Sequence, residues 1–173
     1  MKQIFKKNKF LIPFLFTFLL VNAQNPDIES ITNFIFEKTN QLRLENNKSE
    51  LTRNKVLDKM AQYHSDNMVK FNFFSHTDSF GDSLGDRAKK MDVKYSLISE
   101  NIAYTPWFIK EVKIGGVNVN EKIASSIFKQ WLNSPGHYKN MIENSVNEIG
   151  IGLEIKISGD SCILYSTQNF RKM

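Results

Sequence analysis

Cysteine is almost absent from this chain, because only Cys162 occurs among its 173 residues. A single thiol cannot form an internal disulfide, so the packed core must hold the fold together. A chain of about 150 residues can do this, since it buries roughly 68–70% of the surface that its unfolded form exposes. Cys162 lies in the apolar stretch 162–165, which predicts a small core residue rather than a reactive thiol.

Acidic residues are missing from the N-terminal region, where none precedes Asp27. The formal net charge of +5 is therefore local, since the first ten residues carry four lysines, at positions 2, 6, 7 and 9. Without these lysines, 19 Lys and Arg face 18 Asp and Glu. Such a nearly neutral body argues against binding to nucleic acid, which depends on clustered positive charge.

Long apolar runs are also missing. The longest run covers residues 10–21 and has 12 residues, whereas a membrane-spanning helix needs about 20. The run follows the lysines and precedes Val21-Asn22-Ala23, which places small residues at the −3 and −1 positions of a cleavage site. We therefore predict a signal peptide over residues 1–23, cleaved after Ala23, and a secreted or periplasmic protein without a stable membrane anchor. An uncleaved N-terminal anchor is the alternative. No cysteine follows the cut, so lipid attachment is not expected.

The rest of the chain has the composition of one globular domain, with 41% apolar and 24% charged residues overall. Apolar residues at helical spacing predict four helices. The first follows Asp27 and ends near residue 46, the second covers about 54–70, the third covers about 87–91, and the fourth follows Asn120 and is stopped at Ser134-Pro135-Gly136.

The C-terminal region has the clearest strand pattern. Five apolar residues at the odd positions 149–157 alternate with glycine, glutamate and lysine. A turn at 158–160 leads into an antiparallel partner over 162–170, and we expect residues 146–170 to form the edge of the sheet. An extended buried segment over 95–104 and a loop or hairpin over 105–119 precede them. Helices followed by a closing sheet predict an α+β fold built in layers.

Only three histidines occur in the chain. His64 lies on the apolar stripe of the second helix, which predicts a packed core residue. His76 and His137 lie in loops beyond helix ends, where functional side chains often occur. Glu100 lies between Ile98 and Ile102 in a segment expected to be buried, so its carboxylate needs partners.

These residues allow two kinds of chemistry. His76, Glu100 and His137 could share a divalent metal such as zinc, although separations of 24 and 37 residues match no local metal motif. Alternatively, Ser134 could act as a nucleophile with His137 as its base and Glu100 orienting the ring. Gly150-Ile151-Gly152 is not a dinucleotide fingerprint, because it lies within a strand pattern. Those glycines instead predict close packing or a bulge.

Four segments of the chain occur in a characteristic order. They are Phe73-Phe74-Ser75-His76, Ser99-Glu100-Asn101-Ile102-Ala103, Trp131-Leu132-Asn133-Ser134-Pro135-Gly136-His137-Tyr138-Lys139-Asn140 and Asn147-Glu148-Ile149-Gly150-Ile151-Gly152. Together they resemble the domain shared by cysteine-rich secretory proteins, antigen 5 and plant pathogenesis-related protein 1, the CAP superfamily, and are most similar to its bacterial secreted, SCP-like branch. The resemblance covers residues 28–170, which implies a single domain over 24–173.

This resemblance implies a three-layer α-β-α sandwich with a central, mainly antiparallel sheet. It also implies a surface cleft with two histidines and two acids. His76, Glu100 and His137 match three of these positions, and Ser134 stands where the eukaryotic pattern has its second acid. We expect Ser134 and Asn140 to orient the His137 ring or its turn behind the metal ligands.

The same resemblance implies a non-catalytic binding module for a divalent metal, a small molecule, a lipid or a protein. Zinc or another divalent metal is expected to bind weakly, to be unnecessary for folding, and to bind less well below about pH 6, where imidazole becomes protonated. The alternative is a secreted hydrolase that uses His76, Glu100 and His137 with zinc or with Ser134.

Overall fold

The structure is a computed structural model that describes residues 26–108, 118–159 and 161–173. The expected signal peptide over 1–23 and most of the expected loop over 105–119 lie outside these residues. In the described ranges, no helix has both the length and the apolar character needed to cross a membrane.

The described residues form helices α1 (Ile28–Glu45), α2 (Lys55–Phe71), α3 (Leu84–Lys90), α4 (Val119–Leu132) and α5 (Pro135–Met141). Asp27 caps α1 as predicted, because its side chain accepts a hydrogen bond from the Glu29 backbone N–H. Asn54 does the same for α2, accepting from the N–H groups of Val56 and Leu57.

Three helix boundaries differ from the prediction. Asn118 rather than Asn120 caps α4. The third helix begins at Leu84, because Ser83 and Asp86 form a capping box that satisfies its first N–H groups. The Ser-Pro-Gly segment at 134–136 ends α4 but also begins α5, since proline is well tolerated at the first position of a helix.

The strands are β1 (Thr52–Arg53), β2 (Leu97–Phe108), β3 (Glu148–Ser158) and β4 (Ser161–Lys172), in the spatial order β1-β3-β4-β2. β1 pairs with β3 in parallel, and the other neighbours are antiparallel. The predicted hairpin of β3 and β4 is therefore confirmed. Its expected place at the sheet edge is wrong, because β4 lies between β3 and β2, and β3 lies between β1 and β4.

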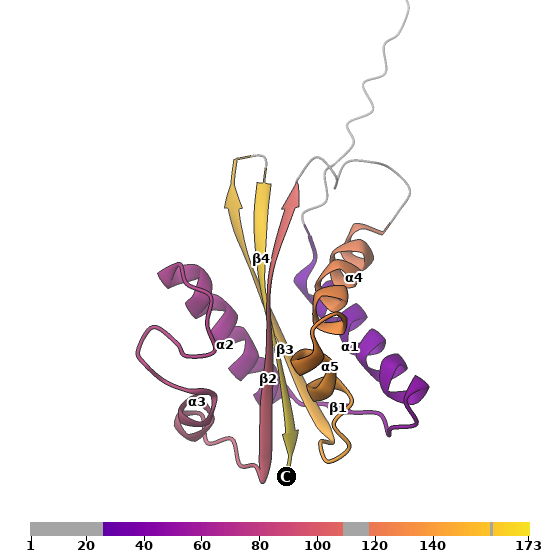
Figure 1. The fold of residues 1–173 in the computed structure, drawn as a ribbon. Coiled ribbons are helices and arrows are strands. Elements are labelled where there is room, and N and C mark those ends of the chain that lie inside the picture. Colours follow the sequence, from indigo (N-terminus) through magenta and orange to yellow (C-terminus); the bar gives the residue numbers. More distant parts are fainter. Residues whose placement is uncertain (1–25, 109–117, 160) are drawn as a thin grey trace, which may run out of the picture.

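The sheet is the middle of three layers and is seen nearly edge-on in Figure 1. α2 and α3 lie on one side of it, and α1, α4 and α5 lie on the other, as the resemblance implied. The larger core fills the space on the α1 and α4 side and includes the fully buried Trp131 and Phe170. Cys162 belongs to this core, and burial raises the pKa of its thiol. Its expected structural role is confirmed.

The two glycines of β3 allow α2 to lie directly against this strand. A Cβ atom on Gly150 would stand 2.1 Å from the Leu57 carbonyl carbon, and one on Gly152 would stand 2.1 Å from the Gln62 nitrogen. The close approach is used for hydrogen bonding. Asp58 Oδ1 accepts from the Ile151 N–H at 2.8 Å, and Gln62 Oε1 accepts from the Leu153 N–H at 3.0 Å. Side chains of α2 thus accept hydrogen bonds from backbone N–H groups of β3 beyond the two residues that pair with β1.

Leu153 tests which face of β3 is buried. Its side chain is fully buried in the larger core, so Leu153→Ala should lower the free energy of unfolding by about 3 kcal/mol, within the range of roughly 2–5 kcal/mol for buried leucines. Ile157 continues the same alternation but is 69% exposed. Ile157→Ala is therefore the matched control and should cost less than about 0.5 kcal/mol. Urea denaturation measures both, and equal small costs would reject the assigned face.

Candidate functional site

Glu100 lies in β2, and its side chain is only 2% exposed. Its Oε2 accepts a hydrogen bond from Arg87 Nη2 at 2.6 Å, and its Oε1 accepts from His76 Nδ1 at 3.0 Å. Asn169 Nδ2 donates to Oε2 at 3.1 Å when the amide is oriented so that both of its ends have partners. The buried carboxylate therefore has the partners that it requires.

Arg87 is the partner of Glu100 that sequence reasoning missed. It lies in α3 and is 1% exposed. While Nη2 holds Glu100, Nη1 donates to the backbone carbonyl of His76 at 2.8 Å and to that of Asp82 at 3.1 Å. One guanidinium group thus holds both the buried carboxylate and the loop that carries His76. Nothing in the local sequence of this short polar helix marks the arginine as buried.

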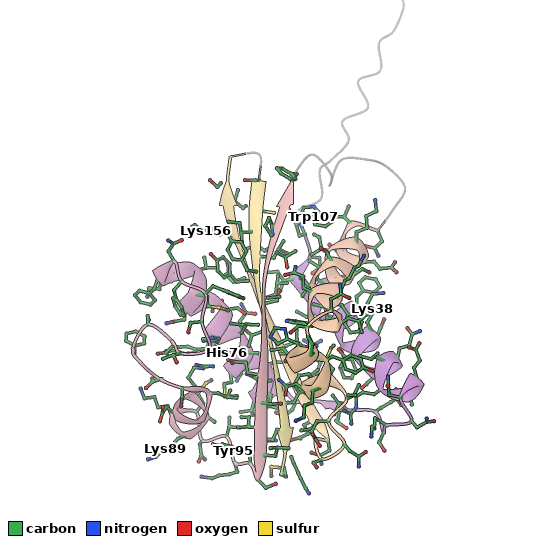
Figure 2. The ribbon with its side chains drawn as sticks, in the orientation of Figure 1. Lys38, His76, Lys89, Tyr95, Trp107 and Lys156 are labelled. Carbon is green, nitrogen blue, oxygen red and sulfur yellow. The ribbon has the colours of Figure 1, made fainter. Side chains whose placement is uncertain are left out.

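The loop between α2 and α3 is held by α2 and presents His76 to solvent. Asn72 ends α2 with a left-handed backbone conformation, φ 55°. Asn67 then accepts a hydrogen bond from the Ser79 N–H at 3.1 Å, and the buried carboxylate of Asp78 accepts from two N–H groups of the loop itself. The His76 side chain remains 55% exposed. It lies beside β2 near the middle of the strand (Figure 2).

His64 is a packed core histidine, as predicted, and it also holds this loop. Its side chain is completely buried, and its Nε2 donates to the Ser75 carbonyl at 2.9 Å, since a carbonyl can only accept. The same nitrogen lies 3.8 Å from Glu100 Oε1. Burial lowers the pKa of His64, although the charge of Glu100 acts in the opposite direction. The imidazole is therefore neutral at pH 7.

This burial predicts acid sensitivity. Below about pH 6.5 the unfolded chain binds a proton at His64 more readily than the folded protein does, so stability falls as the pH falls. We expect the free energy of unfolding to decrease between pH 7.5 and 5.5 because of this residue, by at most about 1.4 kcal/mol. In His64→Gln the amide can still donate to the Ser75 carbonyl, and the decrease should shrink by that amount. Urea denaturation at both pH values is the measurement, and equal decreases in the two proteins would contradict the assignment.

His137 approaches β2 from the opposite layer, in α5. Asn101, which follows Glu100 in β2, donates through Nδ2 to the His137 carbonyl at 3.1 Å. Asn140 donates to Asn101 Oδ1 at 2.8 Å and to the Glu100 carbonyl at 3.3 Å. Asn140 thus links α5 to β2, and neither its contacts nor that of Asn101 involve the His137 ring.

The two histidines outside the core lie within electrostatic range of each other. Partial burial lowers the pKa of His137, and the charge of His76 lowers it further. Two consecutive residues of β2 therefore hold the two histidines. Glu100 faces the α2 layer and contacts the His76 ring, while Asn101 contacts the His137 backbone carbonyl.

Ser134 occupies the N-cap position of α5, but its side chain makes no capping hydrogen bond. In the described part of the chain, no hydrogen bond joins its hydroxyl group to His137. The carboxylate of Glu100 contacts His76 rather than His137. The geometry that a Ser134 nucleophile would need is therefore not assembled.

Both oxygens of Glu100 accept hydrogen bonds in this structure, from Arg87 and from His76. Within the described ranges, no group of three or more His, Cys, Asp or Glu side chains is placed to hold a metal ion. Because Nδ1 of His76 donates to a carboxylate, Nε2 carries the lone pair of a neutral ring and is the nitrogen available to a ligand.

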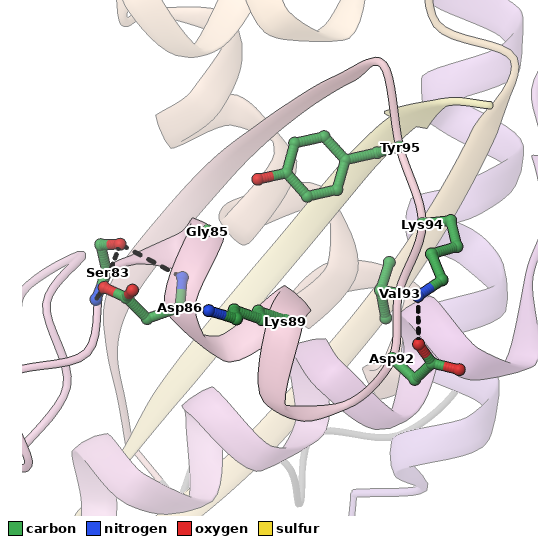
Figure 3. Close-up of a pocket in the computed structure, with 8 residues that line it drawn as sticks. All are labelled: Ser83, Gly85, Asp86, Lys89, Asp92, Val93, Lys94 and Tyr95. Carbon is green, nitrogen blue, oxygen red and sulfur yellow. Dashed lines mark hydrogen bonds and ion pairs between the residues drawn. The ribbon is translucent and has the colours of Figure 1, made fainter.

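The surface also has a hollow away from these histidines. A cavity of about 510 Å³ lies between α3 and the chain that leads into β2, and Tyr95, Lys89 and Val93 are among its lining residues (Figure 3). Its acidic groups already have partners: Asp86 caps α3 with Ser83, and Asp92 pairs with Lys94. Neither His76 nor His137 lines this cavity, so it is separate from the pair of histidines.

Comparison with known proteins identifies the fold and the family. The profile of CAP, described as the cysteine-rich secretory protein family, matches residues 36–170. The chain belongs to the CAP family. The match spans α2, β2, β3 and both candidate histidines, so the site described above lies wholly within the CAP domain.

Relatives of this CAP protein include bacterial proteins. A Bacillus subtilis protein named "Uncharacterized membrane protein YlbC" is 29% identical over 138 residues, which are 80% of this chain and 33% of that protein. An extracellular SCP-domain protein from Bacillus anthracis has a TM-score of 0.66 and 27% identity, covering 84% of this chain and 41% of the other. An outer surface protein from Borrelia burgdorferi has a TM-score of 0.62 and 20% identity, covering 85% of this chain and 96% of the other. This chain thus spans less than half of the first two proteins.

Proposed function

We propose that this CAP protein is a non-catalytic binding module that holds a divalent metal such as zinc, weakly and reversibly, through Nε2 of His76 and a ring nitrogen of His137. Two protein ligands leave coordination positions open for water or for a donor atom of a small molecule, a lipid head group or a protein. The bound metal would supply a Lewis-acidic point of attachment for such a ligand.

The observation that carries this proposal is the state of Glu100. Its carboxylate is buried and accepts from His76 Nδ1 at 3.0 Å. A carboxylate that holds one nitrogen of a histidine fixes the ring and strengthens the other nitrogen as a metal ligand. The exposed ring of His76 is thereby held with Nε2 available to bind a metal.

Catalysis has less support. A hydrolase would need a base held against a nucleophile, but Glu100 is occupied by Arg87 and His76. Among the described residues, Ser134 makes no capping bond and none to His137. Binding requires only that the two rings keep a lone pair available, which the depressed pKa of His137 favours.

We also infer that the protein acts outside the cytoplasm. Support comes from the order of charged, apolar and small residues over 1–23 and from a structural relative described as extracellular. Cleavage after Ala23 would leave the domain over 24–173 secreted or periplasmic.

Zinc titration tests the binding proposal. By isothermal calorimetry at pH 7.5, His76→Ala and His137→Ala should each weaken zinc binding at least about 10-fold, because each removes one of two ligands. The rings are on the surface or partly buried, so both variants should keep the wild-type circular dichroism spectrum.

Two outcomes would contradict it. Equal zinc affinity in the wild type and both variants would show that the histidines are not the ligands. Treatment with a chelator should leave the unfolding midpoint unchanged, since the hydrophobic core lies apart from the histidines. Unfolding on chelation would refute a weak, optional metal.

A further inference from the structure

We propose that Arg87 is the positioning residue of the His76 ring. It does not face the ligand, because its side chain is 1% exposed. Instead it contacts two groups that determine where His76 lies: the Glu100 carboxylate at 2.6 Å and the His76 carbonyl at 2.8 Å.

The two contacts constrain different parts of His76. The contact with the carbonyl fixes the backbone from which the side chain extends. The contact with Glu100 fixes the carboxylate that accepts from Nδ1, and so it selects the tautomer and the ring orientation. With Nδ1 protonated, the unprotonated Nε2 is the nitrogen that is free to bind.

The geometry requires an arginine rather than any cation. A guanidinium group is planar and presents its N–H groups in a fixed fork, whereas a lysine ammonium is a compact point charge on a flexible stem. Here Nη2 reaches the carboxylate while Nη1 reaches the carbonyls of His76 and Asp82. The capping box of Ser83 and Asp86 holds the start of α3, so the guanidinium group is attached to a fixed base.

Arg171 provides a matched control elsewhere in the same sheet. It is 7% exposed, donates through Nε to Glu148 Oε2 at 2.6 Å, and donates through Nη1 to the Lys94 carbonyl at 3.0 Å. Like Arg87, it joins a carboxylate to a backbone carbonyl, but neither group belongs to the histidine site. Arg171→Lys should therefore remove a buried guanidinium group that joins a carboxylate to a carbonyl, as Arg87→Lys does, but should leave the His76 ring unaffected.

The test is ¹⁵N NMR of the histidine rings in metal-free protein at pH 8, with the His76 signals assigned from His76→Ala. In the wild type we expect His76 to be the Nδ1–H tautomer alone. In Arg87→Lys we expect a mixture of the two His76 tautomers. Arg171→Lys should match the wild type. A zinc titration, which rests on the proposed function, should show binding weakened about 10-fold in Arg87→Lys only.

An unchanged His76 tautomer in folded Arg87→Lys would overturn the positioning role. This holds whether or not zinc binds to the wild type and to Arg87→Lys. Absence of zinc binding to the wild type would instead refute the proposed function, and the tautomer shift would still support positioning. If Arg87→Lys does not fold, the wild type decides alone. A single Nδ1–H tautomer together with slowly exchanging guanidinium protons of Arg87 supports the proposal, and mixed tautomers or freely exchanging protons overturn it.

Discussion

Gly152→Ala is expected to lower the free energy of unfolding by about 5 kcal/mol or more, which is at the upper extreme for a single substitution. The added Cβ would stand 2.1 Å from the Gln62 nitrogen and 2.3 Å from the Ala61 carbonyl carbon. Both are backbone atoms in the interior of α2, so no side chain can rotate to make room. The helix itself would have to move away from β3.

That movement would disrupt more than packing. The hydrogen bonds from β3 to Asp58 and Gln62 depend on the close approach, and the buried hydroxyl of Ser65 lies 3.3 Å from the Gly152 carbonyl. α2 also carries His64, which holds the loop of His76. Loss of stability should therefore be accompanied by loss of the site.

Gly136→Ala is the matched control. No atom lies within 4 Å of the Cβ position at Gly136, and the residue lies in α5, where alanine is favoured over glycine by roughly 1 kcal/mol. Urea denaturation should show Gly136→Ala unchanged or slightly more stable. A cost below about 1 kcal/mol for Gly152→Ala would show that α2 does not lie as close to β3 as described.

The parts of the fold that were predictable carry a repeating local pattern. Alternation at 149–153 indicates the two faces of β3, and the expected turn after it indicates an antiparallel partner, so both strands and their pairing were predicted. Local sequence patterns did not predict the elements whose formation depends on tertiary contacts. β1 has only two residues and exists because it pairs with β3. α5 was missed because Pro135 was interpreted only as a stop.

The candidate site shows the same division. His76 and Glu100 could be selected from the sequence because histidine is rare in this chain and a carboxylate in an apolar segment requires partners. Their contact at 3.0 Å agrees with that reasoning. Arg87 could not be selected, because an arginine among lysines and aspartates in a short helix is typical of an exposed surface. Its burial arises from the packing of α3 against β2, which no local spacing records.

Arg87→Met should lower the free energy of unfolding by about 4 kcal/mol, because removal of one partner of a buried ion pair leaves the other charge uncompensated, at a cost of roughly 3–5 kcal/mol. Glu100 would remain 2% exposed with only the weaker donors His76 and Asn169. The His76 and Asp82 carbonyls would also lose their donor. Urea denaturation at pH 7.5 is the measurement.

Arg53→Met is the matched control for this substitution. Arg53 donates to Asp58 at 3.0 Å and also to Asn33 and Thr32. The Arg53 and Asp58 side chains are 23% and 27% exposed, and partly exposed pairs of this kind contribute about 1 kcal/mol or less. A cost for Arg87→Met as small as that of Arg53→Met would show that Glu100 does not depend on Arg87 for its charge.

The double variant Arg87→Met with Glu100→Leu separates charge from packing. Replacing both members of a buried ion pair by apolar groups of similar size is often nearly neutral, so the double variant should recover most of the roughly 4 kcal/mol lost in Arg87→Met. It should nevertheless bind zinc as weakly as His76→Ala, because His76 would have lost the carboxylate that accepts from Nδ1. A stable protein with impaired binding would show that the ion pair is kept for the histidine rather than for the fold.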